Sequence, residues 1–124
     1  MMNAEQQNVR ALFSKLLKRP CVLFPPTRAE LDAPMTHGVY IIRRGETVLH
    51  VGRSVRGQYG LRQRLYDHLH GSSSFTYYYL KGKGKRLRKG HSYQCLPIPN
   101  ARMRALVESH AIGELCPKHL RTGK

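Results

Sequence analysis

The chain has 124 residues, with 22 Lys and Arg against 7 Asp and Glu and a formal charge of +15 at pH 7. This length fits one domain, and 40% hydrophobic content supports a small core. So much positive charge repels itself unless a polyanion neutralises it, which favours a nucleic acid partner. A membrane is disfavoured because no segment spans a bilayer or joins a large apolar face to a basic one.

The cysteines indicate a reducing compartment. Cys21, Cys95 and Cys116 lie far apart in the sequence and form no C-x-x-C pair, a pattern typical of free thiols. The first residues lack the charged and apolar regions of a signal peptide. We therefore expect a cytoplasmic protein.

Residues 1–35 are expected to form a helix and a proline-rich connector that pack on a domain of residues 36–124. The apolar residues near the start recur at helical spacing and stop before Pro20: Val9, Leu12, Phe13, Leu16 and Leu17. Residues 20–36 hold four prolines and read mostly as an ordered connector. Thr27 and Glu30 could cap one short helical turn there.

The middle of the chain predicts a hairpin followed by a helix. Residues 38–43 and 47–52 are β-prone, and Gly45 lies in the turn between them. Tyr40 and His50 would then lie on neighbouring strands. Leu61, Leu65 and Leu69 form one stripe of a helix over residues 60–70.

The last third predicts two strands and a helix. Residues 75–80 and 91–98 are strand candidates, and at least one of Tyr77, Tyr78 and Tyr79 should point into the core because strand side chains alternate. A helix should begin after Asn100, its cap. The predicted class is α+β: an antiparallel sheet with helices packed beside it.

Glu108 is the best candidate metal ligand. Ile112 and Leu115 follow at helical spacing, so its carboxylate shares a face with apolar side chains and must be paired or metal-bound. A salt bridge at the rim of the core is the favoured reading from spacing alone. A lone carboxylate suits Mg²⁺ or Mn²⁺, which keep several waters and bind substrate phosphate directly.

Arg64 and the pair formed by Tyr40 and His50 could also carry chemistry. Arg64, at the edge of the leucine stripe, could clamp a phosphate, although a solvated arginine is the simpler reading. Tyr40 and His50 are candidates for proton transfer, with core filler and a backbone-bonded histidine as the alternatives.

Residues 81–89 hold six basic side chains close to three tyrosines. This composition suits phosphate contact and base stacking, and the alternative is a flexible solvated loop. The side chains that we expect to bind nucleic acid here are Lys81, Lys83, Lys85, Arg86, Arg88 and Lys89.

Four sequence elements occur in a diagnostic order. Gly38-Val39-Tyr40 precedes His50-Val51-Gly52, then Arg64 follows in a helix and Glu108 in a later helix, before Pro117. In this order the chain resembles the GIY-YIG nuclease family from about Thr36 onward. The resemblance implies two adjacent strands carrying the tripeptides, a catalytic set of Tyr40, His50, Arg64 and Glu108, and one divalent metal on Glu108.

The resemblance also implies that Arg53 and His68 match positions that are often basic or histidine in the family, and we predict that they contact nucleic acid. Two positions depart from the pattern. His50 replaces the second tyrosine, and Leu120, beside His119, stands where the family has an asparagine.

The sequence thus predicts a divalent-metal-dependent endonuclease that hydrolyses phosphodiester bonds, with DNA favoured over RNA and a protein partner as one source of specificity. The departures support an alternative, a catalytically weakened or inactive nucleic-acid-binding module on the same fold. A third reading, a basic RNA-associated protein with an accidental match, would scatter the four residues across the fold.

Overall fold

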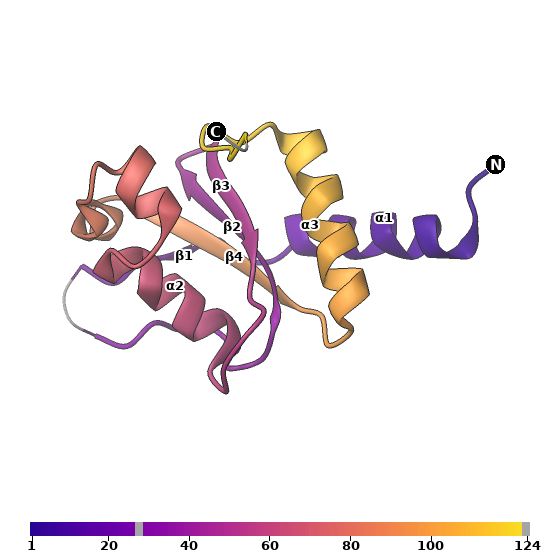
Figure 1. Ribbon diagram of the computed structural model, residues 1–124, viewed down its shortest axis with the longest axis horizontal. Coiled ribbons are helices and arrows are strands. Elements are labelled where there is room, and N and C mark those ends of the chain that lie inside the picture. The colour runs from indigo at the N-terminus through magenta and orange to yellow at the C-terminus, as the bar shows by residue number, and fades with distance from the viewer. Residues whose placement is uncertain (27–28, 123–124) are drawn as a thin grey trace.

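The computed structural model describes residues 1–26 and 29–122. It has a four-stranded antiparallel sheet with helices on both sides (Figure 1), so the predicted α+β class is confirmed. In chain order the elements are α1 (Ala4–Leu17), β1 (Val22–Leu23), β2 (Gly38–Arg44), β3 (Thr47–Arg53), α2 (Gly60–His70), the π-helical turn η1 (Phe75–Tyr79), the 3-10 helix η2 (Gly84–Arg88), β4 (His91–Pro97) and α3 (Ala101–Leu115).

The central strand β2 pairs with both of its neighbours in the sheet order β1-β4-β2-β3. Tyr40 lies opposite Gly52 of β3 on one side and Cys95 of β4 on the other. The predicted hairpin is confirmed, and Gly45 takes a left-handed conformation in its turn with φ of +60°, which suits a residue without Cβ.

The two faces of β2 enter two separate apolar cores. Tyr40 and Ile42 join the core under α2, whereas Val39 and Ile41 join the core under α1 and α3. Figure 1 shows α2 on one side of the sheet and α1 with α3 on the other. This division follows from the period of two along a strand that is buried on both faces.

The predicted caps and connector are partly as expected. Asn100 caps α3 by accepting from the backbone N–H of Met103 at 2.9 Å, as predicted. The connector also contributes β1, in which Val22 pairs with Tyr93 of β4; prolines on both sides of this short strand conceal it in the sequence. The predicted cap at Thr27 lies outside the described residues.

The strand predicted over residues 75–80 is wrong, because this segment is the π-helical turn η1. Its backbone closes locally, with Leu80 N–H donating to Phe75 O at 3.2 Å, and Ser73 Oγ accepts from Thr76 N–H. Phe75, Thr76 and Leu80 are buried while the three tyrosines at 77–79 are all exposed. Local capping by Ser73 therefore outweighs the β-propensity of the aromatic run.

The basic run is a packed segment. Leu87 of η2 is fully buried in the core under α2. A Cβ added at Gly84 would overlap the carbonyl groups of His68 and Leu69, so η2 lies directly against the end of α2.

Among the residues that the structure describes, no helix is both long and apolar enough to cross a membrane.

We expect Leu87→Ala to lower the free energy of unfolding by about 2–5 kcal/mol, since it leaves a cavity in a closed core. The neighbouring exposed Lys89→Ala should change stability by less than about 0.5 kcal/mol. Urea unfolding followed by circular dichroism measures both. Equal, small effects for the two variants would show that the run is a solvated loop after all.

Candidate active site

The four predicted catalytic residues, Tyr40, His50, Arg64 and Glu108, all line one cavity of about 200 Å³. It lies beside the edge strand β3, where α2 from one layer and α3 from the other approach the C-terminal tail. A chance match would have scattered these residues. Their convergence gives the sequence pattern a geometric basis.

Gly52 determines where the phenol of Tyr40 lies. The two residues are register partners on β2 and β3. A Cβ at Gly52 would overlap the phenolic oxygen of Tyr40, so only glycine lets this side chain lie across β3 toward the cavity.

A hydrogen-bond chain fixes the proton positions behind Tyr40. Thr76 Oγ1 donates to the backbone carbonyl of His68, so it accepts from Ser73 Oγ at 3.1 Å. Ser73 Oγ therefore accepts from Nδ1–H of His68, at 2.6 Å. This leaves Nε2 of His68 unprotonated, and Tyr40 Oη donates to it at 2.6 Å.

Burial keeps the proton-transfer candidates neutral. It raises the pKa of Tyr40, an effect that the nearby charge of Arg64 opposes. Burial also lowers the pKa of His68 well below its usual value and that of His50 to about 3, with His119 and Arg64 adding to the effect at His50. Near pH 7 these three side chains are uncharged.

The tail supplies a histidine to which we assigned no role from the sequence. Lys118 and His119 donate backbone N–H bonds to Val48 and Leu49 of β3, at 3.1 and 2.8 Å. His119 Nδ1 then lies 3.2 Å from His50 Nδ1. The one sequence signal for a role of His119 in the site is its position beside Leu120 in the last motif. Nothing in the sequence shows that the tail pairs with β3.

Glu108 forms an ion pair with Arg53, whose Nη1 lies 2.5 Å from Oε1. The Glu108 side chain is only 18% exposed, so the favoured prediction of a salt bridge at the rim of the core is confirmed. It is also the only carboxylate among the residues that line the cavity, against Arg53, Arg64 and Arg121. This excess of positive charge favours an anion.

The side chains that could bind a metal here suit a hard cation that keeps most of its water ligands, rather than one enclosed by protein ligands. Within residues 1–26 and 29–122, no three His, Cys, Asp or Glu side chains gather to hold a metal. One inward carboxylate suits Mg²⁺ or Mn²⁺, which retain most of their waters. Arg53 would have to release or share Glu108 when such an ion binds.

The predicted nucleic-acid contacts separate into three groups. His68 is fully buried and bonded at both ring nitrogens, so the prediction that it touches nucleic acid is wrong. Arg53 lines the cavity. The residues of the basic run lie elsewhere, around η2 and the end of α2, where four of them line a second hollow: Lys83, Lys85, Arg86 and Lys89.

Comparison with solved structures identifies the architecture. The magnesium-bound GIY-YIG N-terminal endonuclease domain of UvrC from Thermotoga maritima aligns over 98% of this chain and 100% of its own, with a TM-score of 0.55 and 17% identity. A point mutant of that domain, bound to its catalytic divalent cation, gives 0.54 and 18% over the same shares. This chain has the GIY-YIG fold. Neither protein-family models nor curated proteins give a match.

Two positions distinguish this GIY-YIG fold from the family's sequence pattern. His50, in the place of a tyrosine, stacks on Phe75 with ring centroids 4.7 Å apart. Leu120, in the place of an asparagine, is 54% exposed at the cavity wall. His119 is the neighbouring tail residue that contacts His50, so the tail still presents a polar side chain to the cavity.

The low pKa of His50 predicts a pH-dependent stability. Its unfolded form binds a proton below about pH 6.5, whereas the folded form resists protonation down to about pH 3. Stability should thus be full above pH 6.5 and fall as the pH decreases, by about 2 kcal/mol at pH 5 for this residue.

Urea unfolding of the wild type and His50→Phe at pH 8 and pH 5 measures this contribution. The variant keeps the ring on Phe75 and has no titrating group, so it should lose less stability between the two pH values. An identical loss in both proteins would contradict the assignment to His50.

Proposed function

We propose that this protein is a divalent-metal-dependent endonuclease that hydrolyses phosphodiester bonds, with DNA as the favoured substrate. The observation that carries the proposal is the convergence of Tyr40, His50, Arg64 and Glu108 on one positively charged cavity. In this proposal residues 1–35 pack on a nuclease domain of residues 36–124, which works in the cytoplasm.

Glu108 would hold Mg²⁺ or Mn²⁺, which would supply Lewis-acid stabilisation of charge on the phosphate. The structurally similar UvrC domain binds magnesium, which supports Mg²⁺ as the metal. Arg64 would contact a phosphate oxygen with its guanidinium. Arg53, once released from Glu108, would contact the phosphate as well.

Tyr40 and His68 form the proton acceptor for the attacking water. As the water oxygen attacks phosphorus, its proton passes to Tyr40 Oη and the phenolic proton passes to His68 Nε2. The low pKa of His68 opposes this transfer. A phosphate beside Arg64 offsets one of the charges that lower that pKa, and the leaving oxygen takes its proton from solvent.

A non-catalytic nucleic-acid-binding module is the second candidate. It is favoured by the ion pair that already satisfies Glu108 and by exposed Leu120 in the place of an asparagine. Both candidates predict binding of nucleic acid, so cleavage decides between them.

Glu108→Gln should lower cleavage by roughly a thousandfold or more, because it removes the only carboxylate that the cavity offers a metal. The assay uses branched, duplex and single-stranded DNA and RNA with Mg²⁺, Mn²⁺ or EDTA, and EDTA should abolish wild-type cutting. Glu114→Gln, an exposed carboxylate on the same helix, is the matched control. Wild-type binding without cutting under every condition would support the non-catalytic module.

Tyr40→Phe should reduce cleavage by roughly 10²- to 10⁴-fold, since it removes the hydroxyl that passes the proton. Binding, measured by fluorescence anisotropy in EDTA, should stay within about twofold because the ring and its packing remain. Cutting at the wild-type rate would exclude Tyr40 as the acceptor and leave the buried His50 as the remaining candidate.

A further inference from the structure

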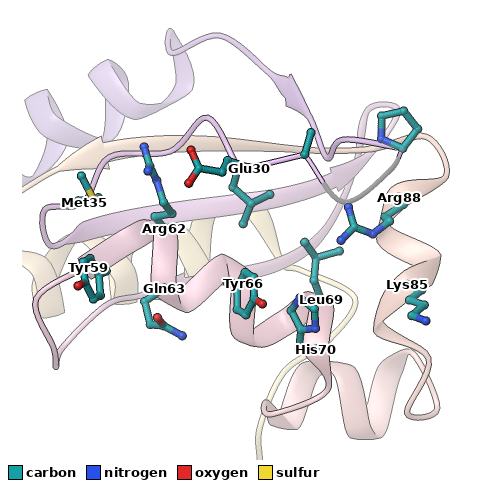
Figure 2. Close-up of a pocket in the computed structure, with 13 residues that line it drawn as sticks. Glu30, Met35, Tyr59, Arg62, Gln63, Tyr66, Leu69, His70, Lys85 and Arg88 are labelled. Atoms are coloured by element: carbon teal, nitrogen blue, oxygen red, sulfur yellow. The ribbon is translucent and has the colours of Figure 1, made fainter.

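A third hollow, here named the α2 groove, has a volume of about 900 Å³ and lies on the outer side of α2. Figure 2 shows that α2, the connector around Glu30 and Met35, and the η2 region surround it. It shares no lining residue with the cavity that contains Arg64.

Exposed aromatic side chains form the α2 side of this groove. Tyr59 and Tyr66 are 50% and 49% exposed, and Figure 2 shows them in a row with Gln63 and His70 along the helix. The spacing from 59 to 63, 66 and 70 places all four on one helical face. The ring centroids of Tyr66 and His70 lie 3.9 Å apart with the rings inclined by 31°, so His70 packs against one face of the Tyr66 ring and a base would use the other face.

The charge of the groove suits a polyanion. Glu30 is the only acidic side chain among its lining residues, whereas Arg62, Lys85 and Arg88 are basic. Lys85 is exposed and also borders the adjoining hollow, which Lys83, Arg86 and Lys89 line. These cations counter the negative end of the α2 helix dipole, which would otherwise repel a phosphate.

From this combination we propose that the α2 groove binds an unpaired segment of nucleic acid, with a base stacked on Tyr66 and phosphates held by Lys85 and its neighbours. Flat aromatic surfaces beside a basic track are the features with which proteins hold single strands. A volume at the upper end of the range for ligand sites leaves room for splayed bases. A duplex hides its base faces and could not use the tyrosines.

The inference rests on the proposed nuclease function, because it assigns an unpaired region to the substrate of the same protein. Arg64 lines the catalytic cavity while Tyr66 lines the groove, so one helix serves both sites. A branched substrate could place its duplex at the cavity and its single strand along the groove.

Three variants test the stacking surface of the groove, and Lys85→Ala tests its charge. Tyr66→Ala removes the stacking ring, Tyr66→Phe keeps it, and Leu23→Ala removes an apolar side chain that lies outside the groove, 65% exposed on β1. Fluorescence anisotropy in EDTA measures the Kd for labelled thymidine and uridine oligomers, a blunt DNA duplex and an oligoglutamate peptide. Thermal unfolding confirms that each variant folds.

Tyr66→Ala should weaken single-strand binding by roughly 5- to 150-fold, the range for the loss of one stacked base. Tyr66→Phe and Leu23→Ala should stay within about twofold of wild type, as should the duplex affinity of the Tyr66 and Leu23 variants. Lys85→Ala should reduce the slope of log Kd against log salt concentration by the amount that corresponds to about one phosphate contact.

Unchanged single-strand affinity in Tyr66→Ala would overturn the proposal, as would an equal loss for strand and duplex. Loss of oligoglutamate binding alone would assign the groove to an acidic peptide instead. Because these measurements need no cleavage, the two proposals can fail separately. If the protein cleaves nothing but needs Tyr66 to bind single strands, the groove proposal stands and the nuclease proposal fails. If cleavage depends on Glu108 but single-strand binding does not depend on Tyr66, the nuclease proposal stands and the groove proposal fails.

Discussion

Burial of β2 on both faces is the constraint from which the rest of the architecture follows. A strand with no solvent face must satisfy both backbone edges, which β3 and β4 do, and must offer apolar side chains to two cores. Val39 and Ile41 serve one core, and Tyr40 and Ile42 serve the other. Tyr40 is the exception in chemistry, because its hydroxyl lies at the boundary between the core under α2 and the cavity.

The charged side chains of the site and the side chains proposed to transfer protons occupy different positions. Arginines line the cavity, whereas His50 and His68 are kept neutral by burial, by the histidines beside them and by Arg64. Protonated histidines beside Arg64 would add further repulsion to a chain with a formal charge of +15. A neutral His68 instead leaves Nε2 open to accept a proton from Tyr40, so that in the proposed mechanism its positive charge would arise only during the reaction.

The sequence predicted the parts of the fold that local patterns encode. β-Prone segments around a glycine turn predicted β2 and β3, a further strand candidate predicted β4, and the leucine stripe predicted α2. The order of Tyr40, His50, Arg64 and Glu108 predicted a shared site, and they line one cavity. The wrong strand prediction over residues 75–80 has a local cause, because the Ser73 hydroxyl caps the aromatic run at 75–79 as a helical turn. The pairing of the tail with β3 leaves no short-range signal. His68 follows Leu61 and Leu65 at helical spacing, so the leucine stripe does carry a signal for its burial.

The tail that covers His50 is joined to β3 through Lys118 and His119, by two backbone hydrogen bonds. A segment held so lightly opens far more often than the strands beneath it. Each opening would rehydrate His50 and remove His119, two of the causes that lower its pKa. The imidazole is thus a weak base while covered and a stronger one while uncovered. Brief opening of residues 118–121 would give the site a second, more basic state within the same fold.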